Sequence, residues 1–154
     1  MLMQTELTLQ PGEVLEILGN RLTFQVTGEQ TGGAYSLVEY LAAPGYPGPA
    51  PHVHQTFDEL FLVLEGAPTF MLEGQTVVGA PGSVVAVPRG KVHAFGNPGA
   101  APARFLCIST PAGFELYFKE LAALVTSQTG PLDMAALLPD LQILWERYDS
   151  LPAK

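Results

Sequence analysis

Cysteine is almost absent from this chain, which has a single one, Cys107, among its 154 residues. One thiol cannot form an internal disulfide, and its scarcity is compatible with a reducing compartment. Cys107 lies in an apolar run from Phe105 to Ile108, which favours a buried, inert side chain over a nucleophile. The sequence therefore points away from thiol chemistry.

Basic residues and long hydrophobic runs are also scarce. Seven lysines and arginines face 15 acidic residues, and a net charge of −8 argues against a nucleic-acid partner. No apolar run has the length of a transmembrane helix, and the N-terminus lacks the basic and apolar stretches of a secretory signal. We therefore expect a cytoplasmic protein that binds neither nucleic acid nor membrane.

Glycine and proline, in contrast, are plentiful, with 16 and 14 copies in a chain that is 47% hydrophobic. One domain with frequent turns and many short strands fits this composition, in the form of a sandwich or small barrel. Residues 1–112 are expected to form this β domain with its N-terminal strands. The expected strands are Leu7–Leu9, Val14–Leu18, Arg21–Thr27, Tyr35–Ala42, Glu59–Leu64, Thr69–Leu72, Thr76–Val78, Val84–Val87, His93–Phe95 and Ala103–Ser109.

The character of the chain changes after Pro111. Residues 114–127 carry an apolar stripe with helical spacing, and Gly130-Pro131 ends it. Asp133 can cap a second helical stretch over 135–148, which Pro139 is expected to interrupt or restart. We expect residues 113–154 to form one or two helices packed outside the same domain, with Trp145 docked on the barrel or on a partner subunit.

The three histidines of the chain all fall in two patterned segments. His52 and His54 follow Pro51, with Glu59 after four more residues and Gly66 after six more. His93 lies in the pattern Gly-x5-Pro-x-Gly-x2-His-x3-Asn, which runs from Gly82 to Asn97. On a strand, residues i and i+2 face the same side, so the first two imidazoles should share one cavity.

A carboxylate and a third imidazole can enter that cavity from other strands. Three neutral imidazoles and one carboxylate suit one divalent transition metal (Fe, Mn, Ni, Co, Cu or Zn) and are too rich in nitrogen for Ca or Mg. Octahedral binding would leave two positions open for substrate and for dioxygen or water. The alternatives are an ordinary polar strand face for the histidines and a solvated carboxylate for Glu59, beside Asp58.

Both motifs resemble those of the cupin superfamily, in which His-x-His, Glu and Gly form the first motif and the Gly-to-Asn pattern forms the second. The chain departs from the first motif at one position, where Tyr46 replaces the glycine that usually precedes the first histidine by six positions. The resemblance covers roughly residues 12–125. It implies an all-β double-stranded β-helix, or jelly-roll, barrel with His52, His54, Glu59 and His93 as metal ligands.

Within that superfamily the chain looks most like small single-domain proteins of the quercetin dioxygenase-like type. The segments that suggest this are residues 31–34, 51–54 and 111–115. The resemblance implies a metal-dependent dioxygenase acting on a small aromatic or enolisable oxygenated substrate, with Glu59 alternating between ligand and general base. The alternatives are a non-oxidative metal-dependent isomerase, lyase or hydrolase, or a non-catalytic cupin that binds a small molecule.

Strand parity extends the site beyond the ligands. Phe61, Val63 and Phe95 share the inward direction of Glu59 or His93 and are expected to wall a substrate pocket, with core packing as the alternative for the two phenylalanines. Asn97 is expected to hydrogen-bond the turn after His93 and not to bind metal. Arg89 and Lys91 are expected as exposed turn residues, with substrate anchors as the alternative. An open barrel leaves sheet edges to cover, so a homodimer is expected.

Overall fold

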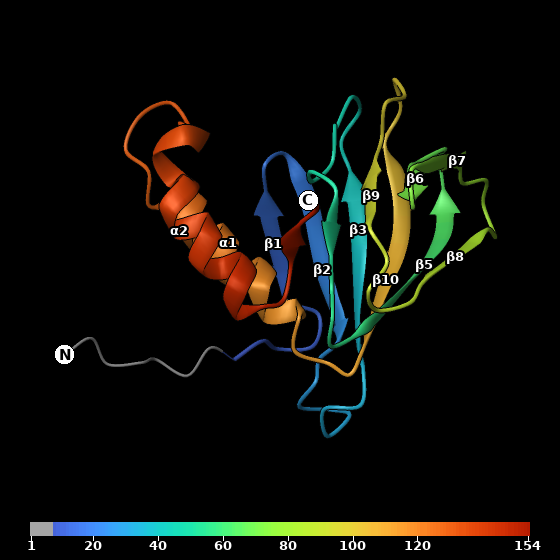
Figure 1. Cartoon of the computed structure of the whole chain (residues 1–154), viewed down its shortest axis with the longest axis horizontal. Coiled ribbons are helices and arrows are strands. Elements are labelled where there is room, and N and C mark those ends of the chain that lie inside the picture. Colours follow the sequence, from blue (N-terminus) through green and yellow to red (C-terminus); the bar gives the residue numbers. More distant parts are fainter. Residues whose placement is uncertain (1–7) are drawn as a thin grey trace.

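The computed structural model describes residues 8–154. Within this range the chain forms eleven strands and two helices, and both helices lie between the tenth and the eleventh strand in the sequence (Figure 1). The elements are β1 (Val14–Ile17), β2 (Asn20–Val26), β3 (Ser36–Ala42), β4 (His52–Val53), β5 (Asp58–Glu65), β6 (Thr69–Leu72), β7 (Gln75–Val78), β8 (Val84–Val87), β9 (His93–Gly96), β10 (Ala103–Thr110), α1 (Glu115–Thr126), α2 (Met134–Arg147) and β11 (Leu151–Pro152).

The strands form two antiparallel sheets. The first has six strands in the order β1-β2-β3-β10-β5-β8, and the second has five in the order β11-β4-β9-β6-β7. Strands distant in sequence are neighbours in both, as in a jelly roll. Both helices lie on the β1 side of the molecule, where α1 contacts β1 (Figure 1). The predicted all-β jelly-roll fold with C-terminal helices packed outside is confirmed.

Most strands occur where alternation of apolar and polar residues predicted them. The exception at the N-terminus is Leu7–Leu9: Leu7 lies outside the described residues, and the structure assigns no strand to Thr8 or Leu9. Two strands were not among the predicted ones. These are β4, which carries His52, and β11, which falls in the tail that was expected to be helical. Each has two residues and is too short to show a period.

The helices follow the prediction in number and position but not in continuity. Asp133 caps α2, since its side chain accepts from the backbone N–H groups of Ala135 and Ala136. The expected break at Pro139 is wrong, because α2 continues through it. The proline only removes the bond to the carbonyl of Ala135, while the buried face of α2 and its contacts with α1 hold the helix together. Among the described residues, neither helix is long and apolar enough to span a bilayer.

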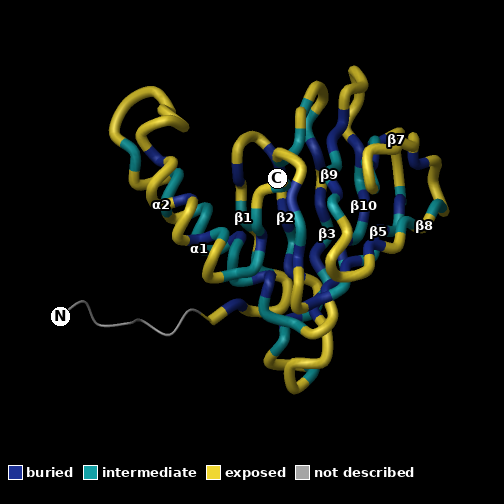
Figure 2. Tube along the Cα trace, in the orientation of Figure 1, coloured by how far each residue is buried: buried dark blue, intermediate teal, exposed yellow. Residues whose placement is uncertain are grey.

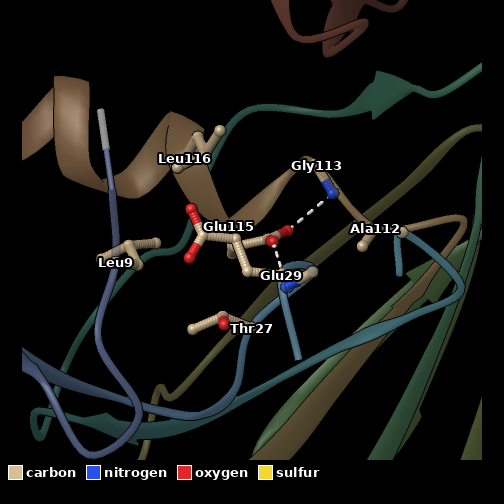
Figure 3. A pocket seen from close by; sticks show the side chains of 9 residues that line it. Leu9, Thr27, Glu29, Ala112, Gly113, Glu115 and Leu116 are labelled. Carbon is tan, nitrogen blue, oxygen red and sulfur yellow. Dashed lines mark hydrogen bonds between the residues drawn. The ribbon is translucent and has the colours of Figure 1, made fainter. Parts of the chain in front are cut away.

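A buried carboxylate fixes the start of α1. Oε1 of Glu115 accepts from the backbone N–H of Gly28 at 2.9 Å, and Oε2 accepts from that of Gly113 at 2.7 Å. Beside it is a hollow of about 190 Å³ that Leu9 and Thr27 also line (Figure 3). None of its lining residues is a histidine, and both oxygens of Glu115 are engaged, Oε1 with the loop after β2 and Oε2 with the residues just before α1.

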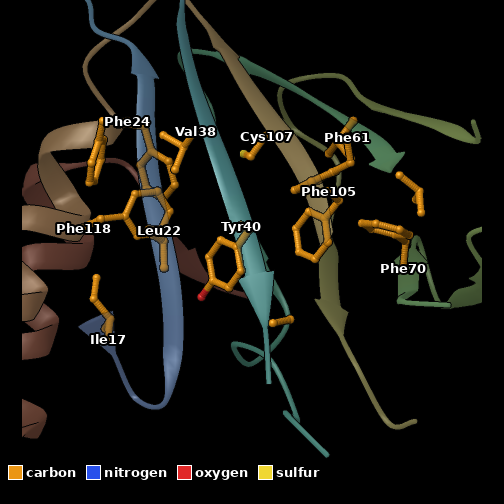
Figure 4. Packing of buried hydrophobic residues seen from close by; sticks show 14 of the residues in the cluster. Ile17, Leu22, Phe24, Val38, Tyr40, Phe61, Phe70, Phe105, Cys107 and Phe118 are labelled. Atoms are coloured by element: carbon orange, nitrogen blue, oxygen red, sulfur yellow. The ribbon is translucent and has the colours of Figure 1, made fainter. Parts of the chain in front are cut away.

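The hydrophobic core lies between the sheets and under α1. Alternate residues of the central strands face inward, so buried and partly exposed positions alternate along the tube in Figure 2. Paired positions on β3, β10 and β5 form inward-facing rows, which are Tyr40, Phe105 and Val63, then Val38, Cys107 and Phe61, then Ser36, Ser109 and Glu59. Figure 4 shows Tyr40 and Phe105 of the first row and all three side chains of the second. The third row turns polar and leads to the candidate site.

Candidate metal centre

Both sheets contribute to one buried cluster of imidazoles and a carboxylate. In the five-stranded sheet, His52 on β4 is paired in register with His93 on β9, and His54 directly follows β4. Glu59 is the second residue of β5 in the six-stranded sheet. One possible ligand atom from each of the four lies within 4.8 Å of the other three. The structure thus brings together the four residues that the sequence predicted as ligands.

The free ring nitrogen is the same in all three imidazoles. Each Nδ1 faces a backbone carbonyl, and a carbonyl oxygen can only accept, so Nδ1 carries the proton. The acceptors are the carbonyls of Ala50, Lys91 and Asp149, at 2.9, 3.0 and 2.6 Å from His52, His93 and His54 respectively. A neutral ring fixed in this way presents its lone pair at Nε2. All three histidines are therefore set to bind a metal through Nε2.

Glu59 lies where such an ion would need an oxygen ligand. Its Oε2 is 3.2 Å from Nε2 of His54 and 2.9 Å from Nε2 of His93. Three atoms with lone pairs repel one another at this distance unless a proton or a cation lies among them. The three nitrogens and one oxygen fit Fe²⁺, Mn²⁺, Ni²⁺, Co²⁺, Cu²⁺ and Zn²⁺ alike. The residues present therefore fit the transition metal that the sequence implies.

Burial and mutual contact set the charge state of the cluster. All four residues are buried, with exposed fractions of 8% for His52, 2% for His54, 5% for Glu59 and 1% for His93. Burial alone would raise the pKa of the Glu59 carboxyl, but with a proton or a cation among these atoms the contacts with His54 and His93 outweigh burial and hold that pKa below its ordinary value. Burial lowers the pKa of His52 to about 4. At neutral pH the carboxylate is ionised and His52 is neutral, as metal ligands must be.

The second oxygen of Glu59 has a partner that the sequence did not predict. Sγ of Cys107 donates to Oε1 of Glu59 at 3.4 Å. The thiol is buried, and its burial raises its pKa well above the ordinary value, so the prediction of an unreactive thiol agrees with its surroundings. Its contact with a candidate ligand arises because Cys107 and Glu59 lie on neighbouring strands, β10 and β5, with inward-facing side chains one row apart.

Asp149 is the other site residue that sequence reasoning missed. Besides its carbonyl, which accepts from His54, its carboxylate Oδ2 accepts from the backbone N–H groups of Gln55 and Thr56 at 2.7 Å each. It lies 95 positions from His54, after the end of α2. No spacing rule connects two such segments, so only the fold reveals the contact.

The predicted pocket residues face the interior but differ in surroundings. Phe61 and Val63 are each 1% exposed and belong to the hydrophobic core. Phe95 is half-buried and lies 5.5 Å from Phe61 and 5.4 Å from Tyr40, measured between ring centroids. The hydroxyls of Tyr40 and Tyr46 are 3.3 Å apart, so phenolic groups also belong to this wall. Phe95, Tyr40 and Tyr46 together form an aromatic wall two residues along β9 from His93.

A second aromatic group covers His54 from the helix side. The ring of His54 lies 4.2 Å from that of Phe57 and 4.9 Å from that of Phe114, the residue that precedes α1. Phe114 in turn stacks on Tyr117 of α1 at 5.1 Å. The start of α1 therefore forms part of the shell around the metal centre.

Asn97 and Arg89, from the second motif, have structural partners. Asn97, buried at 1% exposure, donates from Nδ2 to the carbonyls of Ala42, Ala43 and Ala101. It therefore joins the loop after β3 to the loop before β10, a wider span than the predicted turn after His93. Arg89 is exposed and pairs with Asp58 at 3.1 Å, and Lys91 is exposed.

The histidine-containing part of the chain matches a known domain family. Residues 38–109 match the cupin domain, and this range holds all four cluster residues and ends before α1. No curated protein matches the chain significantly.

Several solved structures resemble the chain. A putative ethanolamine utilization protein Q from Salmonella typhimurium is 30% identical, with 61% of this chain and 71% of that one covered and a TM-score of 0.50. A sugar phosphate isomerase of the cupin superfamily from Silicibacter pomeroyi is 28% identical over 60% of this chain, with a TM-score of 0.52, and the chain spans 59% of its length. The polyketide cyclase RemF from Streptomyces resistomycificus is 25% identical, with 68% and 71% covered and a TM-score of 0.53. The domain match and these likenesses show that the chain contains a cupin domain with the small cupin fold.

Proposed function

We propose that this cupin is a metal-dependent enzyme in which His52, His54, Glu59 and His93 hold one divalent transition-metal ion that binds a small oxygenated substrate. The observation that carries the proposal is the contact of Oε2 of Glu59 with Nε2 of both His54 and His93. With each Nδ1 proton committed to a carbonyl, these atoms fit together around a cation.

Proton transfer without oxidation is the reaction that this site supports best. The ion would supply Lewis-acid polarisation of a substrate oxygen. Glu59, ionised at neutral pH, accepts a proton from the substrate carbon beside the polarised carbonyl and returns it to the same or a neighbouring carbon. Two similar structures support this class, because they are described as an isomerase and a cyclase, names that denote rearrangement and ring closure.

The aromatic wall and the pairing of the basic side chains favour an enolisable substrate that is apolar or aromatic and carries little charge. Phe95, Tyr40 and Tyr46 provide aromatic surface near His93. Five of the seven basic side chains are already paired with carboxylates, which leaves little positive charge for a phosphate. The pairs are Arg21–Glu16, Arg89–Asp58, Arg104 with Glu39 and Glu65, Lys119–Glu13 and Arg147–Glu120. The similarity to a sugar phosphate isomerase therefore supports the reaction class and not the phosphate.

A quercetinase-like dioxygenase is the second candidate. Four protein ligands leave two positions of an octahedral ion free, enough for a substrate oxygen and dioxygen together. In that reaction Glu59 would accept the proton of the substrate hydroxyl. The aromatic wall suits a flavonol-like ring as well as any other enolisable molecule.

Deuterium exchange under anaerobic conditions separates the two candidates. We would purify the protein without added metal, measure its metal content, and incubate it in D₂O with a panel of enolisable ketones, diketones and flavonols. Metal at one equivalent and anaerobic exchange at the carbon beside the carbonyl are expected. Oxygen uptake without anaerobic exchange would favour the dioxygenase, and His52→Ala or His93→Ala protein that retains full metal content would contradict the site itself.

A matched pair of carboxylate variants tests the role of Glu59. Glu59→Gln retains an oxygen ligand but not the base, so the metal should remain while exchange falls by about 100-fold or more. Glu115→Gln removes a comparably buried charge away from the cluster and should leave metal content and exchange unchanged, at some cost in stability. Equal exchange in Glu59→Gln and wild-type protein would exclude Glu59 as the base.

A further inference from the structure

The three imidazoles obtain their backbone acceptors in different ways. His52 and His93 each bond the carbonyl two residues earlier, so the local turn supplies the acceptor. His54 bonds the carbonyl of Asp149, at the other end of the chain. The matched cupin domain ends at residue 109, so this acceptor comes from outside it. One ligand of the metal centre therefore depends on the C-terminal segment.

The C-terminal segment is docked on the histidine strand along its length. β11 pairs with β4, with Leu151 opposite Val53 and Pro152 opposite His52. The N–H of Ala153 donates to the carbonyl of Pro51 at 3.0 Å. Residues 149–153 thus form a strap, a short edge strand that holds the segment from Pro51 to Thr56.

Asp149 fixes the strap at the point nearest the metal centre. Its Oδ2 accepts three hydrogen bonds of 2.7 Å, from the N–H groups of Gln55 and Thr56 and from Oγ1 of Thr56. Its backbone has a positive φ of 53°, which an aspartate tolerates better than most residues. This conformation turns the carbonyl toward His54 while the carboxylate caps the loop that follows His54.

We propose that Asp149 is a positioning residue of the metal centre, through which the C-terminal strap holds His54 in the tautomer and orientation that metal binding requires. This inference rests on the proposed metal site and deepens it, because it makes metal affinity depend on a segment outside the cupin domain. The dependence is reciprocal: a metal bound at Nε2 of His54 stabilises the docked strap by the same factor that the docked strap increases metal affinity.

Three variants at Asp149 and one control test the proposal with Co²⁺ as the probe, by chelator competition and by the visible absorption of the bound ion. Asp149→Gly accepts the positive φ but lacks the carboxylate, so Co²⁺ affinity should fall about 10- to 100-fold and the absorption should shift. Asp149→Asn keeps an acceptor oxygen and should restore near wild-type affinity and absorption. Asp149→Ala adds backbone strain and should be at least as weak as Asp149→Gly.

Asp133→Ala is the matched control, because it removes the other helix-flanking aspartate of the same extension and touches no ligand. It should lower stability and leave the affinity and absorption of Co²⁺ unchanged. If Asp149→Gly binds Co²⁺ as wild-type protein does, or if Asp133→Ala loses as much affinity, the positioning role is wrong. Wild-type protein that binds no Co²⁺ would instead overturn the metal site itself.

Hydrogen exchange on the unmodified full chain provides a second measurement in case a variant does not fold. Co²⁺ should slow exchange at the amides of Gln55, Thr56 and Ala153, which bond across the strap. The amides of Ala135 and Ala136, bonded to Asp133 at the start of α2, should be unaffected. Unchanged exchange at all three strap-bonded amides on addition of a stoichiometric, tightly bound ion would overturn the inference.

Discussion

At the scale of single residues, the two oxygens of Glu59 have different partners. Oε2 faces the imidazoles, while Oε1 accepts from the thiol of Cys107. A buried carboxylate oxygen without a partner is costly, so the thiol both satisfies Oε1 and restricts rotation of the carboxylate. Cys107 thereby affects which oxygen is available to a metal, although it lies outside the ligand set.

Cys107→Val and Cys107→Ser separate the hydrogen bond from the volume of this side chain. Valine leaves Oε1 of Glu59 buried without a donor and should cost about 1–3 kcal/mol in free energy of unfolding, together with weaker metal binding. Serine keeps a donor and should retain most of both. Chemical denaturation and chelator competition measure the two effects. Equal values for the valine variant and wild-type protein would show that the 3.4 Å contact has no energetic role.

At the scale of elements, Pro139 gives a direct test of what holds α2 together. Pro139→Ala restores the N–H that would donate to the carbonyl of Ala135, and the proline ring no longer crowds the helix. This gain in stability is partly offset because alanine makes the unfolded chain more flexible than proline does. We therefore expect the free energy of unfolding to rise by about 1–2 kcal/mol. Pro98→Ala, in an exposed loop, is the control and should give no increase. Destabilisation by Pro139→Ala would mean that the ring itself packs favourably.

The long strands and both helices could be predicted from sequence because each carries its own period. β3 and β10 alternate buried and partly exposed positions over seven or eight residues, and α1 has an apolar stripe. β4 and β11 could not, because two residues show no period and their pairing joins segments almost 100 positions apart. The continuity of α2 through Pro139 depends on packing that local propensity does not include.

The residues of the candidate site also fall into a group that the sequence predicts and a group that only the fold reveals. His52, His54, Glu59 and His93 could be found because their spacing follows from strand geometry and two motifs. Cys107 and Asp149 could not, since each reaches the site only through strand pairing or a long-range contact. Ligand atoms were therefore predictable from the sequence, while the groups that orient them required the fold.

At the scale of the whole molecule, two neighbouring edge strands expose apolar side chains. β7 and β8 are consecutive in sequence and lie at the edges of different sheets. Val77, Val78 and Val84 on them are 52%, 67% and 58% exposed. An apolar edge of this kind favours pairing with another strand. We expect two copies of the chain to associate through this edge as a homodimer.

Charge substitution at this edge tests the association. Val78→Lys combined with Val84→Lys should convert a dimer to a monomer in sedimentation velocity at micromolar concentration. Val14→Lys, on the edge strand β1 of the six-stranded sheet, changes an exposed valine in the same way and should leave the dimer intact. A monomeric wild-type protein, or equal dissociation by Val14→Lys, would contradict the expected interface.

The contact between His54 and Asp149 also has a consequence for the order of events in synthesis. All four candidate ligands have been synthesised once residue 93 is in place, yet the acceptor for His54 arrives 56 positions later, after both helices. A nascent chain can therefore fold much of its sheet structure while His54 still lacks its fixed tautomer. Tight capture of the ion should thus follow the docking of β11 in the maturation of this protein.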